Sequence, residues 1–453
     1  MTPPKPAPRP DKVSLWRYIR LFKQDILSAQ PARLYRAKMA EFRTPFFRSY
    51  LCNTPELVDL VLRARPQDFP KSDRIREGLA PLLRNSVFVT NGPTWARQRR
   101  IIDPAFEGGK LHQSLPDMWQ AGLNCLKRLH KSAGQPIDIE PETSHVAADV
   151  IFRTLFSLPI EDRTAAQVFT AFRAHQMSAP VVNLAALLPL PRWLPRPHSR
   201  QTRETATQIR RLIEELTRHR AEEIAQGTAP DDLATKIMTM TDPETGTRFS
   251  TDEMVDQVAI FFLAGHETSA SALAWALYLL ATHPDWQEQL AEEARCLPAT
   301  APPDMALLKQ LKLSRAVFRE AMRLYPPVPM FVRETTCPET FRKRPVKRGS
   351  QVVISPWHLH RHELLWDNPD GFDPSRWETE NGKSCARQAY IPFSAGARVC
   401  PGAGFAMAEG VLLLSLILRD FRLTALPERP PRPAAQLTVR SKNGIWLTLT
   451  PRQ

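Results

Sequence analysis

The longest helical pattern in the sequence, from Ser250 to about Thr282, limits most strongly how this chain can fold. Ser250 and Glu253 form a capping box that begins a helix, and His283 with Pro284 interrupts the apolar periodicity at the far end. Roughly 30 residues at about 1.5 Å each give a helix of about 45 Å, the width of a whole domain. Such a helix must cross the interior, so we expect a large domain built around it.

The middle of this expected helix is almost free of charge, with the sequence VAIFFLAG. Directly after this run stand His266, Glu267 and Thr268. Polar side chains buried in the middle of a helix are costly unless they have partners or a use. We therefore treat this segment as a candidate functional site.

The rest of the sequence predicts a mainly helical protein with a minor sheet. Strand-like runs are short and lie near Phe46, near Val352 and at 438–450, whereas helical periods dominate after Pro116. The proline-rich residues 1–12 suggest a flexible arm, which leaves residues 13–453 as one domain. A hydrophobic content of 43% suits a globular core, and no run of about 18 apolar residues predicts a membrane span.

Six cysteines are scattered without any CxxC pair, which fits a reducing, cytoplasmic location. The net charge of +14 would suit nucleic acid, anionic lipid or an acidic protein. Because the cations are spread along the chain and the motifs of nucleic-acid readers are absent, we expect no nucleic-acid partner.

The segment 14–27 has apolar residues at helical spacing with cations between them. It could lie on a membrane, but packing on the body is the favoured interpretation.

The strongest chemical signal is the segment from Phe393 to Gly402, which is followed by a strongly apolar helix. It contains Cys400, and a cysteine just before a helix start is expected to have a depressed pKa, because free N–H groups and the helix dipole favour the thiolate. Thiolate is the form that binds iron. Gly396 and Gly402 permit a tight turn and close approach to a flat cofactor, Phe393 can cover the sulfur, and Arg398 can meet a propionate.

These residues match FxxGxRxCxG, and the chain here resembles the cytochromes P450. Four further stretches match in order and spacing, so the resemblance covers essentially residues 30–450. It implies a mainly α, single cytochrome P450-like domain with a small β-rich lobe near the N-terminus. It also implies haem b, whose iron is held by Cys400 between the long distal helix and the helix after the cysteine. O₂ would be the co-substrate.

The resemblance assigns roles to Ala264, Gly265, Glu267 and Thr268, which match AGxET. Gly265 is expected to let the helix loosen above the haem and so give O₂ a groove. Thr268 with Glu267 is expected to relay protons.

Two further groups follow from the family's motifs. Glu320 and Arg323 match ExxR and, with Arg376, imply a buried structural triad behind the haem; a second ExxR at Glu292 and Arg295 is interpreted as surface. The expected propionate ligands are Trp95, Arg99, Arg333, Arg398 and His360. His358, His360 and His362 alternate as zinc ligands on a strand might, but no fourth ligand is apparent.

The distal pocket, by family position, is expected to be apolar. Its lining would comprise Phe88, Phe261, Phe262, Val328, Met330, Phe331 and a loop around Leu187. Nearly all of these residues are apolar, so a polar substrate would leave hydrogen bonds unmade. We expect a terpenoid first and a long-chain acyl compound second.

Taken together, these motifs predict a haem-dependent monooxygenase. The sequence ends soon after its last strand-like run, so electrons are expected from a separate acidic ferredoxin, docked near Arg97, Arg100 and Arg387. A monomer is expected. The alternative is a haem-thiolate protein that binds ligand as a sensor or carrier without turnover, against which the intact Glu267 and Thr268 argue.

Overall fold

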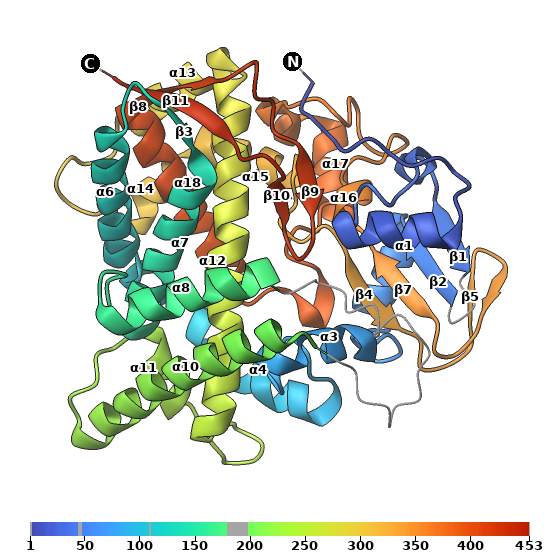
Figure 1. Ribbon diagram of the computed structural model, residues 1–453, viewed down its shortest axis with the longest axis horizontal. Coiled ribbons are helices and arrows are strands. Elements are labelled where there is room, and N and C mark those ends of the chain that lie inside the picture. The colour runs from blue at the N-terminus through green and yellow to red at the C-terminus, as the bar shows by residue number, and fades with distance from the viewer. Residues whose placement is uncertain (1, 44–47, 108–109, 179–197, 453) are drawn as a thin grey trace.

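The computed structural model describes residues 2–43, 48–107, 110–178 and 198–452, and it is mainly helical (Figure 1). The α-helices are α1 (Leu15–Gln24), α2 (Pro55–Asp59), α3 (Asp73–Leu83), α4 (Gly92–Phe106), α5 (Lys110–Gln113), α6 (Leu115–Lys131), α7 (Ile139–Phe156), α8 (Arg163–Ser178), α10 (Arg200–Gln226), α11 (Leu233–Thr239), α12 (Thr251–Ala281), α13 (Pro284–Ala294), α14 (Met305–Gln310), α15 (Lys312–Leu324), α16 (Pro356–Leu359), α17 (Glu380–Gln388) and α18 (Ala403–Asp420). Short 3-10 or π turns occupy Ala32–Tyr35, Leu60–Ala64, Pro374–Glu378 and Gly396–Arg398.

The strands form small sheets beside the helical body. The strands are β1 (Met39–Arg43), β2 (Arg48–Cys52), β3 (Pro136–Asp138), β4 (Phe331–Glu334), β5 (Glu339–Phe341), β6 (Arg344–Val346), β7 (Gln351–Ile354), β8 (Phe421–Ala425), β9 (Pro433–Ala435), β10 (Val439–Ser441) and β11 (Trp446–Pro451). The largest sheet has the order β1-β2-β7-β4, in which β2 and β7 are parallel and the other pairs antiparallel. The expected lobe near the N-terminus therefore also contains strands from residues 331–354.

Helix α12 runs through the middle of the molecule (Figure 1). It begins after Ser250 with the predicted capping box, in which the Ser250 side chain accepts from the Glu253 N–H and the Glu253 carboxylate accepts from the Ser250 N–H. It packs against α7, α10, α15 and α18, and most of its residues are buried. The expectation of one long helix across the interior is confirmed.

The N-terminal arm lies against the body instead of being free. The Tyr325 hydroxyl donates to the Pro4 carbonyl at 2.8 Å, Lys5 pairs with Asp370 at 2.5 Å, and the Arg9 N–H donates to the Gln30 carbonyl at 3.1 Å. The prolines leave carbonyl acceptors and an extended backbone that can dock in this way, and the flexibility expected for residues 1–12 stays a prediction. Among the described residues, no helix is both long and apolar enough to cross a bilayer.

Candidate active site

Cys400 ends a tight loop that leads into α18. The loop is fixed by the Cys400 N–H, which donates to the Phe393 carbonyl at 2.9 Å. Gly396 has φ +65°, and a Cβ there would lie 2.0 Å from the Leu62 carbonyl oxygen, so only glycine fits. A Cβ on Gly402 would meet the Cys400 sulfur at an ordinary 3.9 Å. The loop thus has one strict glycine requirement, at Gly396.

Cys400 is an exposed residue, although protein atoms surround its thiol. Burial raises the pKa of the Cys400 thiol, while the Gly402 N–H and the Arg99 guanidinium act in the opposite direction. The expectation of a depressed pKa was therefore wrong for the protein alone. Enclosure by protein outweighs the single N–H group that the helix start offers to the sulfur.

The accessible stretch of α12 contains Ala264 and Thr268. Ala264 is exposed and Thr268 is half-buried, whereas Phe262, Leu263, His266 and most other residues of the helix are buried. The Thr268 hydroxyl donates to the Ala264 carbonyl at 2.6 Å. These residues lie one turn apart on one helix face. That face can therefore line a cofactor or substrate space.

Gly265 serves close packing and not a break in the helix. A Cβ there would lie 2.4 Å from Cδ1 of Ile151, which belongs to α7. Helix α12 is continuous from Thr251 to Ala281. The expected loosening at Gly265 is thus absent from this stretch, and the missing side chain instead lets α7 approach.

Glu267 is nearly buried and turns toward the β9–β10 region. Its Oε1 accepts from the Thr438 hydroxyl at 2.7 Å and lies 3.6 Å from the Arg440 guanidinium, while Oε2 has no hydrogen-bond partner. Among the described contacts there is no hydrogen bond between Glu267 and Thr268. A proton passing between the two side chains would therefore need an intervening group, and the role expected for the pair stays a prediction.

A second buried acid, Glu409 of α18, was missed from the sequence. The Ser269 hydroxyl of α12 donates to its Oε2 at 2.6 Å, and burial raises the pKa of Glu409 to about 8. This bond ties the helix after Cys400 to the residue next to Thr268. The available signal was a single acid within the apolar run AGFAMAEGVLLL.

Four cations gather around Trp95, close to the Cys400 loop. Lys71, Arg398 and Arg99 lie 5.6, 5.2 and 5.9 Å from the Trp95 ring centre, respectively. Arg333 is close enough to lower the pKa of Lys71. Lys71 was not predicted, since nothing in the sequence around it marks a ligand; its Nζ donates to the carbonyls of Val87 and Thr90.

The chemistry of this cluster fits an anionic group. Burial and the neighbouring guanidinium groups lower the pKa of Lys71 to about 6 and that of Arg333 to about 10. The Nε atoms of Arg333 and Arg398 are buried without a hydrogen-bond partner. Only Arg99 is neutralised, by Asp103 at 2.7 Å, and it also donates to the Val399 carbonyl. Two carboxylates, as on haem, could accept hydrogen bonds from the three remaining cations and neutralise two of their charges.

His360 is not available to such a group. It is fully buried, its Nε2 accepts from the Ile391 N–H at 2.9 Å, and its carbonyl accepts from Arg323. This contradicts the expected contact with a propionate. In the described part of the chain the residues close enough to share an ion are Asp68, Cys337 and Glu339, not His358, His360 and His362, and Arg65 pairs with both of these acids.

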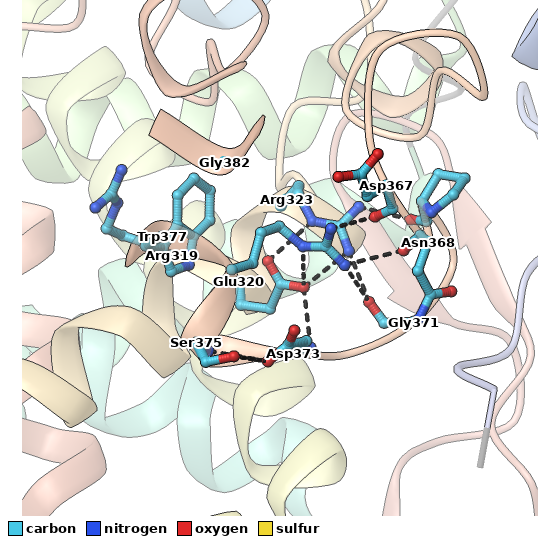
Figure 2. Close-up of polar contacts among 12 residues, drawn as sticks. Arg319, Glu320, Arg323, Asp367, Asn368, Gly371, Asp373, Ser375, Trp377 and Gly382 are labelled. Atoms are coloured by element: carbon cyan, nitrogen blue, oxygen red, sulfur yellow. Dashed lines mark hydrogen bonds and ion pairs between the residues drawn. The ribbon is translucent and has the colours of Figure 1, made fainter. Parts of the chain in front are cut away.

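Glu320, Arg323 and Arg376 form the buried triad that the sequence implied. Figure 2 shows Glu320 and Arg323 beside the loop that contains Asn368 and Gly371. Arg323 donates twice to Glu320, at 2.9 and 2.8 Å, and Arg376 donates to the same carboxylate at 3.2 Å. The remaining N–H groups bind main-chain carbonyls, with Arg323 donating to Gly371 and Arg376 to Asn368. The triad therefore pins the 367–373 loop to α15.

The expected pocket residues divide into two groups. Phe88 is exposed, and Phe261, Val328, Met330 and Phe331 are partly buried. Phe262 is buried, with its ring centre 4.3 Å from that of Phe152 and 5.0 Å from that of Phe172, so it belongs to the packing against α7 and α8 and not to a lining. Leu187 lies outside the described residues.

Comparison with known proteins gives one consistent result. The family model for cytochrome P450 matches residues 38–448. Cyclooctatin synthase of Streptomyces melanosporofaciens is 32% identical over 86% of this chain and 84% of its own length. Cyclooctat-9-en-7-ol 5-monooxygenase of the same organism is 31% identical over 92% and 87%. The crystal structure of the cytochrome P450DA heme domain covers 100% of this chain and 98% of its own, with a TM-score of 0.81 and 25% identity.

Proposed function

This chain belongs to the cytochrome P450 family of haem-dependent monooxygenases, and we propose that Cys400 is the residue that binds the haem iron. The supporting observation is an exposed cysteine next to a buried cluster of cations with unpartnered N–H groups. Haem held by a thiolate supplies the oxidising power to place one oxygen atom of O₂ into a substrate. Lys71, Arg333 and Arg398 would hold its carboxylates.

The test of this assignment is Cys400→His. Neutral imidazole donates less electron density than thiolate, so the variant should lose the thiolate-type carbon monoxide band of the reduced enzyme and all product formation. Cys385→Ser is the matched control, because Cys385 is buried elsewhere, against the Leu365 carbonyl. A thiolate-type band that survives in Cys400→His would assign the ligand to another residue.

Thr268, on the accessible side of α12, is proposed to hold a proton that the reaction with O₂ requires. Its hydroxyl donates to Ala264, which leaves its lone pairs free to accept from water or a bound ligand. Thr268→Ala should retain haem and substrate binding but release more peroxide per electron consumed. Unchanged coupling of reductant to product would remove Thr268 from proton delivery. Glu267, held by Thr438, would act as a second proton store behind it.

The substrate is proposed to be a terpenoid, with long-chain acyl compounds ranked second. The accessible lining of Phe88, Met330 and Phe331 is apolar, and a relative is named for a cyclic alkenol, cyclooctat-9-en-7-ol. Titration of the ferric enzyme with a terpene set and a fatty-acid set should give saturable low-spin to high-spin shifts. Shifts confined to small polar compounds would contradict the apolar pocket.

The electron donor is proposed to be a separate acidic protein, such as a ferredoxin. Two of the expected docking residues are already engaged, since Arg97 pairs with Glu253 at 2.7 Å and Arg100 with Asp242 at 2.6 Å. Arg315 and Arg319, by contrast, have no acidic partner in the described structure. They line a surface pocket of about 330 Å³ together with Tyr390, Phe393 and Met407. Exposed Arg387 lies in the neighbouring helix α17.

This docking site can be tested with Arg315→Gln/Arg319→Gln. The double variant should slow reduction by a ferredoxin and flatten its dependence on salt, because attraction between opposite charges is screened over about 8 Å at physiological ionic strength. Arg211→Gln/Arg218→Gln removes two exposed cations from α10 as the control. Equal effects of both double variants would show that only net charge matters.

A further inference from the structure

Helix α1 has two unlike faces. Tyr18, Ile19 and Phe22 are partly buried, with the Tyr18 and Phe22 rings 5.8 Å apart and the Arg9 guanidinium 5.6 Å from the Tyr18 ring. No residue of α1 is fully buried. The inner face therefore rests on the arm and the body, as the favoured interpretation of the sequence expected.

The outer face exposes a tryptophan among cations. Trp16 is 83% exposed, the most exposed of the large apolar side chains in the described structure. Arg20 and Lys23 follow it by four and seven residues, so all three lie on the same side of the helix. The packing of this chain does not explain why a large apolar ring is exposed to water beside two cations.

The surroundings of this face are uniformly positive. Lys12, Arg17, Arg20 and Lys23 are exposed and form no ion pair in the part of the chain that the structure describes. There is no acidic residue from Lys12 to Gln24. The flanking acids are occupied elsewhere: Asp11 pairs with Arg33 at 3.6 Å, and Asp25 is buried as an acceptor for the N–H groups of Leu27 and Ser28.

From these observations we propose that α1 binds the surface of an anionic lipid bilayer through Trp16, Arg20 and Lys23. Tryptophan favours the headgroup region, where its apolar ring is covered and its N–H remains hydrated. Lysine and arginine are attracted by anionic headgroups. A convex helix with a protruding ring fits a broad soft surface better than an acidic protein, which would need a pocket for the ring. The enzyme would then meet apolar substrates where they dissolve.

Vesicle sedimentation with the haem-loaded enzyme tests this proposal. The vesicles would contain phosphatidylcholine alone or with 30% phosphatidylglycerol, at low and at physiological salt. Each cation near such a surface strengthens binding about fivefold, so Arg20→Gln/Lys23→Gln should weaken binding roughly thirtyfold. Trp16→Ser should weaken it severalfold, and Trp16→Tyr should restore most of the loss. Arg211→Gln/Arg218→Gln, on α10 far from α1 in Figure 1, should bind like the parent.

The possible results of this experiment either support the membrane-binding proposal or overturn it. Binding to the anionic vesicles that α1 variants weaken and the α10 control does not would support the proposal. No binding to the anionic vesicles, or equal losses in both double variants, would overturn it. If the α1 variants bind vesicles normally but are reduced more slowly by a ferredoxin, the face serves an acidic protein and the proposal fails. The carbon monoxide spectrum of each variant reports the haem separately, so a failure of the proposed function would be seen independently.

Discussion

At the scale of single residues, two groups of buried charged side chains differ in how their charges are compensated. The Glu320 carboxylate compensates two buried guanidinium groups, whereas the four cations around Trp95 have only Asp103 among them. The first arrangement is complete within the chain. The second requires an anion from outside, and the two arrangements predict opposite responses to substitution and to pH.

Glu320→Gln should destabilise the protein strongly. It leaves Arg323 and Arg376 buried without compensation, a cost of about 3–5 kcal/mol. The sequence offers a matched control in Glu292→Gln, because Glu292 and Arg295 have the same spacing but are exposed. That variant should change the unfolding free energy by less than about 0.5 kcal/mol in urea unfolding. Similar effects of the two substitutions would remove the triad from the account of stability.

Lys71 should make the haem-free protein more stable as the pH rises. Its pKa is lowered to about 6 in the folded protein from an ordinary value near 10.5, so the unfolded chain binds one more proton between these values. The melting temperature of the haem-free protein should therefore rise between about pH 6 and 9. Haem carboxylates would keep Lys71 protonated, so the rise should disappear in the haem-loaded enzyme. Lys71→Met should also abolish it; a slope that persists in this variant would assign the effect to another group.

At the scale of elements, α12 shows what a sequence can and cannot predict. The capping box and the His-Pro pair predicted its ends to within one or two residues, because both signals are local. The roles along its length depend on neighbours that arrive from other parts of the chain. Gly265 faces Ile151, Glu267 turns to Thr438, and Ser269 binds Glu409. Motif matching placed Gly265 and Glu267 on the right helix, but it could not predict these contacts, and it expected a loosened helix where Gly265 instead packs against α7.

Gly265→Ala should destabilise the contact between α12 and α7. The added methyl group would lie 2.4 Å from Ile151, and such overpacking costs about 1–3 kcal/mol, against a gain of about 1 kcal/mol in helix propensity. In the double variant Gly265→Ala/Ile151→Ala the methyl has room, so the coupling between the two substitutions should be favourable. Additive effects in urea unfolding would mean that Gly265 is needed for something other than packing.

At the scale of the whole molecule, the sequence predicted the architecture but not the contacts between segments that are distant in sequence. The ExxR and cysteine-loop motifs fix the order of elements, so the mainly helical fold with its small sheets was confirmed. The places where distant segments meet carry no periodic signal. Lys71 joins the Trp95 cluster through the carbonyls of Val87 and Thr90, and Pro4 reaches Tyr325 across 321 positions of sequence.

Removal of residues 2–9 should lower the melting temperature by about 2 °C. The deletion takes away the acceptor of the buried Tyr325 hydroxyl and the partner of Asp370, each worth about 1 kcal/mol. Tyr325→Phe in the full-length chain should reproduce part of the loss. If the shortened and full-length proteins melt together, the contacts of the arm contribute nothing to stability.

The cluster around Trp95 has a consequence for how the enzyme matures in a cell. Lys71, Arg99, Arg333 and Arg398 come from four separate stretches of the chain, and burying their cationic groups together costs free energy that no anion of the chain except Asp103 offsets. A newly synthesised chain should therefore be less stable before haem binds than after it. Under iron starvation, the haem-free population would be the one exposed to proteases.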